Sequence, residues 1–465
     1  MRKAPKVALL LLACGGATAC GKVKKSGAEQ PDPAITMDAT KGSVVPARTA
    51  PRARPRPLTA TVPAKGIQWF PKPTAEARKD FTVLLDVLEA LSKKSETPLK
   101  RASALRRTAW MMGQLGFQKR GIALAKKALR EFDGPNMPEP LIRIMPNFAI
   151  TLAILGDTEA ARGAAANALK KWNAKKREGD TDRFVQTLIV VHARTGDYDG
   201  AAKFYARLPP AEAKRFREAI PRNAALRGDF DEAFRRAAEL PAHEGVIIMI
   251  GIVEEALRRR DEKNLRAALS GVKKLFTQAQ TNIVVVGALI RYVELACRAG
   301  MRAEALAKAE FAKSAFKDAP SFRQGFLRDL AASLGRGGMK AEARKLLEEL
   351  AGALKPEEVG TPIDLHHLAI AAAKAGLAPL ARSLYARAKQ SAVQWEKMLN
   401  RAILFPSMVV DLHLQLGELE PALKELAKLK VGDQVYQLIE LGRILHRHPR
   451  RLKPAELAAL RSLAK

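Results

Sequence analysis

The stretch GDYDGAAKFYARLP, residues 196–209, contains the pattern that decides the fold. A glycine at its start can end one helix, because glycine adopts the left-handed backbone conformation at low cost. The acid that follows can begin the next helix by accepting free backbone N–H groups. Ala201, the fifth residue after Gly196, is small enough to let two antiparallel helices approach closely. The stretch therefore predicts the turn and second helix of a helix-turn-helix unit.

The same spacing recurs along the chain, where eight glycines have a small residue as their fifth successor. The pairs are Gly116/Gly121, Gly156/Ala161, Gly196/Ala201, Gly228/Ala233, Gly300/Ala305, Gly338/Ala343, Gly376/Ala381 and Gly417/Ala422. The gap of 72 residues between the fourth and fifth glycines contains a degenerate turn at Arg260 and Asp261. Units of this length bury their apolar faces only by stacking, so we predict about nine units over residues 75–432. Residues 433–465 are expected to form C-terminal capping helices.

Two of these turns, GDYDGA and GDFDEA, resemble the second half of the tetratricopeptide repeat. The resemblance covers roughly residues 100–430 and implies an all-α, right-handed superhelical solenoid of helix-turn-helix repeats. Several units exceed the length of about 34 residues that is typical of that family. Pro146, Pro221 and Pro406 fall within first helices, where a proline is expected to kink a helix or mark its start.

The first 20 residues, MRKAPKVALLLLACGGATAC, have the layout of a secretory signal, with a basic leader, an apolar run and small residues before Cys20. The apolar run is shorter than the roughly 20 residues of a membrane-spanning helix. Cys14 and Cys20 are each preceded by alanine and followed by glycine, which resembles the lipobox of bacterial lipoproteins. The resemblance implies lipidation at Cys20, or alternatively at Cys14. Glycine after either cysteine implies, by analogy with enteric bacteria, an outer-membrane anchor facing the periplasm.

Residues 21–74 are rich in proline and arginine and show no helical period, so we predict a disordered tether. The whole chain has 80 Lys and Arg against 48 Asp and Glu, which gives a formal charge of +32 and predicts attraction to polyanions. Aromatic residues make up only 5%, which disfavours single-stranded nucleic acid because such ligands need stacking platforms. Export disfavours a nucleic-acid partner further. Cys297, the one cysteine after the signal, is expected in the helical core and not in a disulfide.

No arrangement in the sequence predicts catalysis, a cofactor or a metal site. The seven histidines show no metal-ligand spacing, and His446 and His448 are two positions apart, so they point to different faces of a helix. Phosphate-binding loops and serine elbows are absent from the sequence. An active site assembled from several repeats would escape this reading, and enzymatic activity therefore stays a remote alternative.

In the resembled family, the first helix of each unit lines a concave groove. Residues 13, 10, 6 and 3 positions before the turn glycine share one face of that helix. The arginines at these positions are Arg106, Arg143, Arg183, Arg215, Arg222 and Arg328. Other side chains predicted on the same face are Trp110, Ile150, Gln186, Glu218, Ile290, Glu294, His366 and His413. Arginine binds carboxylates or phosphates in bidentate fashion, so an acidic peptide segment or an anionic polymer is the expected guest. In a chain this rich in arginine, several arginines would fall at any chosen set of positions by chance. Trp110 also fits a position in the buried core.

These features favour an exported, lipid-anchored scaffold that binds protein segments, in cell-envelope assembly or maintenance. The alternative is a basic solenoid that binds a polyanion, which would be an anionic glycan, lipopolysaccharide or nucleic acid. Polyanion binding would weaken steeply with salt, whereas a protein interface with apolar contacts would not. The sequence leaves the partner and the oligomeric state open.

Overall fold

The computed structural model describes residues 67–68, 73–134, 137–174, 181–279, 283–315, 320–355, 358, 360–399 and 403–464. The chain divides into a unit Met1–Arg56 and a unit Pro57–Lys465, and every described residue belongs to the second. The predicted signal, Cys14, Cys20 and most of the predicted tether lie outside the described residues.

All regular secondary structure in the described residues is helical. The elements are α1 (Ala75–Lys93), α2 (Pro98–Gln114), α3 (Gln118–Phe132), α4 (Glu139–Leu155), α5 (Thr158–Ala174), α6 (Thr181–Arg194), α7 (Tyr198–Tyr205), α8 (Pro210–Phe216), α9 (Ala219–Arg227), α10 (Phe230–Ala237), α11 (Ala242–Arg259), α12 (Glu262–Ala279), α13 (Ile283–Arg298), α14 (Arg302–Ala315), α15 (Pro320–Arg336), α16 (Lys340–Gly352), α17 (Thr361–Lys374), α18 (Ala378–Leu399), α19 (Pro406–Leu416), α20 (Leu419–Leu426), α21 (Val431–Arg447) and α22 (Pro454–Ala464). The expected all-α helical-repeat fold is confirmed.

The predicted turns have the expected backbone conformation. All eight turn glycines have φ between 72° and 93°, and Arg260 has φ of 62° at the degenerate turn. In the opening stretch, α6 ends before Gly196, and the Asp197 carboxylate accepts the Gly200 N–H at 2.9 Å and caps α7. The prediction of these nine turns is therefore confirmed.

The small residues five positions after the turns allow the paired helices to pack closely. Their side chains are fully buried, at 0% exposure, in Ala161, Ala201, Ala233, Ala305, Ala343, Ala381 and Ala422. At Gly121, an added Cβ would lie only 2.7 Å from the carbonyl oxygen of Ala109 in the facing helix. Larger side chains at these positions would force the two helices of a unit apart.

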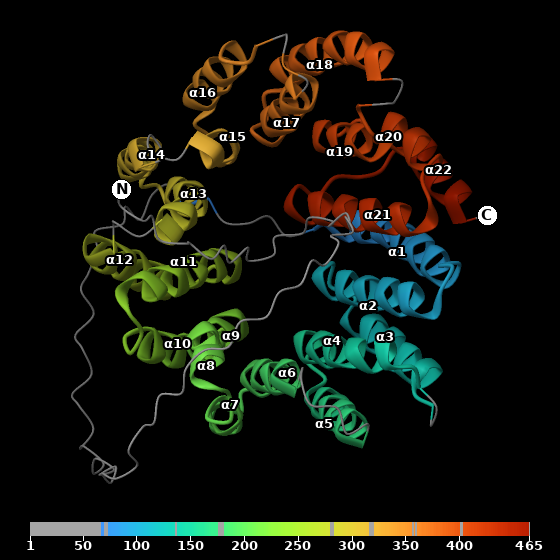
Figure 1. Cartoon of the computed structure of the whole chain (residues 1–465), viewed down its shortest axis with the longest axis vertical. Coiled ribbons are helices and arrows are strands. Elements are labelled where there is room, and N and C mark those ends of the chain that lie inside the picture. Colours follow the sequence, from blue (N-terminus) through green and yellow to red (C-terminus); the bar gives the residue numbers. More distant parts are fainter. Residues whose placement is uncertain are drawn as a thin grey trace, which may run out of the picture. The chain divides into compact units, whose positions relative to one another are not determined.

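The helices form two layers (Figure 1). The inner helices are α2, α4, α6, α9, α11, α13, α15, α17, α19 and α21, and each packs against the next one along the chain. The outer helices α3, α5, α7, α10, α12, α14, α16, α18 and α20 pack mainly on the inner helices, whereas the last outer helix, α22, packs on α1 and on α20. Because the inner helices are closer together than the outer ones, the stack curves toward the inner layer.

The curvature brings the last unit against the first. Helix α21 packs on α1 and α2, and α22 packs on α1 and α20, so the inner layer of the described residues closes into a ring. One hydrophobic core runs through this junction and includes Phe81, Met111, Leu438 and Leu445. The buried carboxylate of Asp80 in α1 accepts hydrogen bonds from Arg451 Nε and the Leu452 N–H, both at 2.8 Å. The C-terminal helices thus join the two ends of the repeat array.

Two local features depart from a uniform repeat. Helix α8 is an additional short helix between α7 and the inner helix α9. Pro406 begins α19 and Pro221 lies in the first turn of α9, whereas Pro146 lies inside α4 and is buried. Two of the three prolines therefore mark helix starts, where the missing N–H removes no intrahelical hydrogen bond.

The core is built mainly of alanine, leucine, isoleucine and valine. Cys297 is a buried free thiol whose Sγ lies 3.0 Å from Met339 Sδ, which confirms its predicted core position. Among the described helices, none combines the length and apolar character that a membrane span requires.

Candidate functional site: the inner layer of the helical ring

The sequence-predicted groove arginines are spread around the ring. Arg106 lies in α2, Arg143 in α4, Arg183 in α6, Arg222 in α9 and Arg328 in α15, all of them inner helices. They lie on five different inner helices.

The remaining predicted arginine, Arg215, lies on the additional helix α8 and not on an inner helix. The spacing rule misplaced it because it assumed one continuous helix before Gly228, whereas a break separates α8 from α9. The side chains of Arg183 and Arg215 lie outside the described residues.

Arg106 has the most perturbed environment of this set. Loss of hydration, with a smaller contribution from the neighbouring charge of Arg107, lowers the pKa of Arg106 to about 10. Its Nε is buried and has no hydrogen-bond partner among the described residues. A guanidinium in this state would gain from an added carboxylate or phosphate.

The other described arginines of the set have mixed environments. Arg143 pairs with Glu139 at 2.9 Å and lies over the ring of Trp172 at 5.4 Å. Arg328 pairs with the adjacent Asp329 at 3.3 Å. Arg222 is exposed. The surroundings of these three arginines leave room for contact with a ligand but do not identify one of them as its binding site.

Two other residues predicted on the groove face are buried, and this part of the prediction is wrong. His366 is 0% exposed, and its Nε2 lies 3.0 Å from the carbonyl oxygen of Met408. Burial is the main cause that lowers the pKa of His366 to about 4, so this imidazole is neutral near pH 7. Glu294 is 2% exposed and lies in an ion-pair network. Packing between successive inner helices covers both positions.

A group of charged side chains lies at the C-terminal ends of several inner helices. We define the arginine cluster as Arg194, Arg258, Arg259, Arg291, Arg298, Arg336 and Arg447, which come from α6, α11, α13, α15 and α21. Ion pairs connect five of these arginines to Glu254, Glu255 and Glu294. Six of the seven stand in the last turn of their helix, where a cation interacts favourably with the helix dipole. Seven arginines against these three glutamates, with Glu440 acting on Arg447 as a fourth, leave the cluster with excess positive charge.

Glu294 is the centre of the network. Its carboxylate lies 2.7 Å from Arg291, 2.7 Å from Arg336 and 3.3 Å from Arg298. Burial alone would raise the pKa of Glu294, but the three arginines outweigh burial and hold the pKa at about 2. Arg291 also pairs with the half-buried Glu254 at 2.8 Å, so ion pairs link α11, α13 and α15.

Two arginines of the cluster, Arg194 and Arg447, have no ion-pair partner among the described residues. Loss of hydration is the main cause that lowers the pKa of Arg194; the charge of Glu255 opposes it, and the charges of Arg259 and Arg258 add to it. Nη1 of Arg194 is buried without a hydrogen bond. Arg447 is exposed to water, yet reduced hydration followed by the charges of Arg291 and Arg336 lowers its pKa. These two side chains are therefore the groups most available to an anion.

Sequence reasoning missed this cluster because it sampled positions 13, 10, 6 and 3 before each turn glycine. Several arginines of the cluster lie closer to the turn glycine than these positions. An arginine occurs two residues before the glycine at Arg194, Arg298 and Arg336. Arg447 follows no repeat turn, and only the closure of the ring brings it to the cluster.

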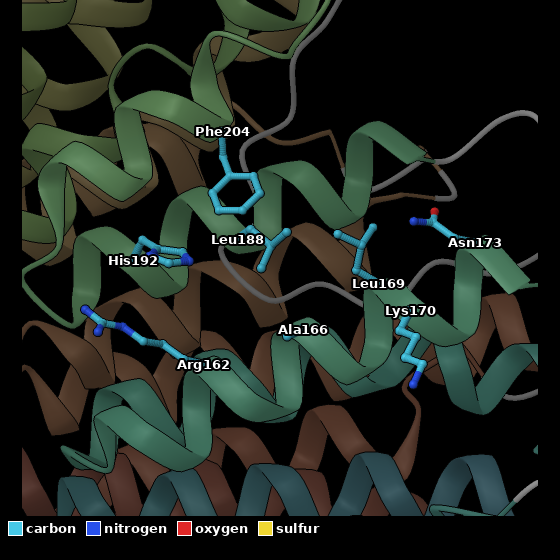
Figure 2. A pocket seen from close by; sticks show the side chains of 8 residues that line it. All are labelled: Arg162, Ala166, Leu169, Lys170, Asn173, Leu188, His192 and Phe204. Atoms are coloured by element: carbon cyan, nitrogen blue, oxygen red, sulfur yellow. The ribbon is translucent and has the colours of Figure 1, made fainter.

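A pocket of about 540 Å³ lies on the outer side, between α5, α6 and α7 (Figure 2). It is lined by Arg162, Ala166, Leu169, Lys170, Asn173, Leu188, His192 and Phe204. Arg162 Nε donates to the Thr195 hydroxyl at 3.3 Å, and His192 Nδ1 lies 2.8 Å from the Asp197 carboxylate. Because these polar groups are already engaged with the turn between α6 and α7, the arginine cluster is the stronger candidate site. The described residues contain no group of three or more His, Cys, Asp or Glu side chains placed to hold a metal ion.

No protein-family model matches the sequence, and no curated protein matches it. Among solved structures, the chain is similar to a circular tandem repeat protein with novel repeat topology and enhanced subunit contact surfaces. That match has 14% identity, covers 83% of this chain and 96% of the other, and has a TM-score of 0.22. The chain is also similar to the pentatricopeptide repeat protein PPR10 from maize, with 12% identity, 74% and 60% coverage and a TM-score of 0.19. TM-scores this low carry no argument about a ligand.

Proposed function

We propose that the chain is an exported, lipid-anchored scaffold whose helical ring binds acidic segments of other proteins, in cell-envelope assembly or maintenance. The arginine cluster is the observation that carries the proposal, because its seven guanidinium groups outnumber the carboxylates that act on them, which are Glu254, Glu255, Glu294 and, at Arg447, Glu440. Guanidinium groups bind carboxylates with paired hydrogen bonds, so an acidic segment would supply the missing negative charge.

The repeat architecture supports a docking role for a polypeptide. The inner helices lie side by side around the ring, so their exposed side chains belong to one continuous layer. Surfaces of this kind give an extended ligand many small contacts with successive units. The export signal and lipobox-like cysteines support a position in the cell envelope, with residues 21–74 as the tether.

A polyanion such as an anionic glycan or lipopolysaccharide is the second candidate. The formal charge of +32 favours it, because basic residues are abundant over the whole chain and not only in the cluster. A polyanion ligand would bind through many equivalent phosphate, sulfate or carboxylate groups and would show little dependence on any one arginine.

Cross-linked pull-down from envelope extracts at low and high salt tests the two candidates. We expect discrete protein partners to remain at high salt and an acidic peptide copied from the partner to displace them. The same peptide with glutamine in place of each acid is the matched control and should not displace them. Capture that disappears at high salt, and that heparin or lipopolysaccharide abolishes equally well, would favour the polyanion candidate and contradict the first.

Lipid attachment is tested by metabolic labelling with a palmitate analogue in the native host. The full chain should carry label, Cys20→Ser should lose it, and Cys14→Ser should keep it, because cleavage before Cys20 leaves a signal of ordinary length. Loss of label in Cys14→Ser instead would move the attachment to Cys14. An unlabelled wild-type chain would rule out the lipid anchor.

A further inference from the structure

The pocket between α5, α6 and α7 has the size and lining of a site for a small ligand (Figure 2). Its volume of about 540 Å³ lies within the range of about 300 to 1,000 Å³ that is usual for such sites. Of its eight described lining side chains, four are apolar, three are basic and none is acidic. The pocket therefore combines apolar walls with positive charge.

Two of the basic lining side chains hold the turn between α6 and α7. A guanidinium nitrogen of Arg162 lies 3.4 Å from the Asp197 carboxylate, and His192 Nδ1 lies 2.8 Å from the same carboxylate. We call Arg162, His192 and Asp197 the turn frame. Because its polar atoms are engaged with one another, the turn frame forms one end of the pocket without needing a ligand.

The same frame recurs at the turn between α19 and α20. Counted from the turn glycines, Arg382, His413 and Glu418 stand at the positions of the three residues of the turn frame. Their contacts are also the same, since the Glu418 carboxylate lies 2.7 Å from Arg382 and 2.8 Å from His413. The frame is therefore a structural link between successive units, and it does not by itself indicate a binding site.

The two units differ in the side chains beside the frame. In α18, the Tyr385 ring lies 6.4 Å from the His413 ring, and Lys389 Nζ lies over the tyrosine at 4.9 Å. The matching positions in α5 hold Ala165 and Leu169. Because a methyl group takes the place of an aromatic ring there, space remains between α5 and α6. The apolar wall at Leu169 is likewise a feature that the structural link does not require.

The far end of the pocket carries donors that the fold does not use. Lys170 and Asn173 lie at the end away from Arg162 and His192 (Figure 2). Among the described residues, neither Lys170 nor Asn173 has a hydrogen-bond or ion-pair partner for its side chain. An ammonium and an amide both donate hydrogen bonds to a carboxylate, and the ammonium also balances its charge.

We propose that this pocket binds a small amphipathic carboxylate. The carboxylate accepts hydrogen bonds from Lys170 and Asn173, and an apolar ring or short chain lies against Leu169, Leu188 and Phe204. One ammonium matches the single charge of a carboxylate, whereas a phosphate monoester carries a charge of about −1.5 to −2 at pH 7. The site goes beyond the proposed function, because its ligand is a small molecule and it lies apart from the arginine cluster.

Equilibrium dialysis of the full chain against 1-naphthaleneacetate, with the same mild detergent on both sides of the membrane, tests the site. The neutral 1-naphthaleneacetamide is the matched ligand. We expect the acid to bind about tenfold more tightly than the amide, because a charge-assisted hydrogen bond is stronger than a neutral one. Lys170→Gln should remove this preference and leave the affinity for the amide unchanged.

Two further variants control for position and folding. Ala166 is exposed on α5 and lines the pocket, so Ala166→Trp should fill it and abolish binding of both ligands, with a thermal unfolding midpoint near that of wild type. Lys203→Gln is the matched control for Lys170→Gln, because Lys203 is exposed on α7 and does not line the pocket. It should bind both ligands as wild type does.

Four results would overturn the inference. The first is a wild-type chain that does not bind 1-naphthaleneacetate, and the second is equal affinity of wild type and Lys170→Gln for this acid. The third is binding that survives Ala166→Trp, which would place the ligand elsewhere. The fourth is tighter binding of 1-naphthyl phosphate, which would contradict the choice of a carboxylate. The pull-down of protein partners remains a separate test of the proposed function, since it does not depend on this pocket.

Discussion

Replacing Glu294 with alanine is expected to lower the free energy of unfolding by about 3 to 5 kcal/mol, because removal of one partner leaves a buried charge network unbalanced. The substitution would leave Arg291, Arg298 and Arg336 facing one another across α13 and α15 without the carboxylate at their centre. Chemical unfolding followed by circular dichroism measures the loss. Glu348→Ala is the control, since Glu348 is exposed on the outer helix α16. A surface change of this kind should stay within about 0.5 kcal/mol.

The pH dependence of a second variant, Glu294→Gln, gives an independent check. The pKa of Glu294 is about 2 in the folded chain, against an ordinary value of 4.5. Because the folded pKa is the lower one, the contribution to stability is complete above pH 4.5 and is lost as pH falls toward 2. The shift corresponds to about 3 kcal/mol, which agrees with the network argument. The difference in stability between wild type and Glu294→Gln should therefore shrink over this pH range, and a constant difference would contradict the assignment.

The second large effect is expected at the junction of the ring. Asp80→Ala removes the carboxylate that accepts hydrogen bonds from Arg451 and from the buried Leu452 N–H. A buried donor left without a partner costs about 1 to 3 kcal/mol, and loss of the charged contact adds to that cost. We expect the loss to be local, with α21 and α22 separating from α1 before the rest of the ring unfolds.

Hydrogen exchange measured by mass spectrometry distinguishes local opening from general destabilisation. Peptides from α1, α21 and α22 should exchange faster in Asp80→Ala, while peptides from α11 and α13 should keep wild-type protection. Asp86→Ala is the matched control on the same helix, because Asp86 is 60% exposed and pairs with Arg120 at 2.7 Å. Exposed ion pairs contribute about 0 to 1 kcal/mol. Equal acceleration in all peptides would show that the junction is not a separate cooperative unit.

The repeat fold was predictable because local rules and packing agree in it. Gly196 and its seven counterparts need the left-handed conformation, and the alanines five positions later need a close helix neighbour, so the turns could be placed from sequence alone. The closure of the array into a ring was not predictable from these local rules. It depends on the summed curvature of all units, and residues 433–465, expected as caps on a free end, instead contact α1 and α2.

The candidate site was likewise predictable from the sequence only in part. The sequence predicted that arginines on the first helix of each unit line the binding groove. Arg106 does lie on an inner helix, and its pKa is perturbed. The sequence could not indicate which positions are covered by the next unit, and so Glu294 and His366 were placed on the wrong surface. Arg447 was missed because its neighbours come from units far away in the chain.

The junction of α21 with α1 and α2 also bears on how the gene for such a chain can evolve. In an open array, duplication or loss of one repeat lengthens or shortens the molecule and leaves every remaining interface intact. Here the curvature of each unit and the total number of units must match, since one extra or missing pair of helices would leave a gap or an overlap where the ends meet. Recombination between repeats should therefore be selected against, and variation should accumulate in the loops and on the outer helices.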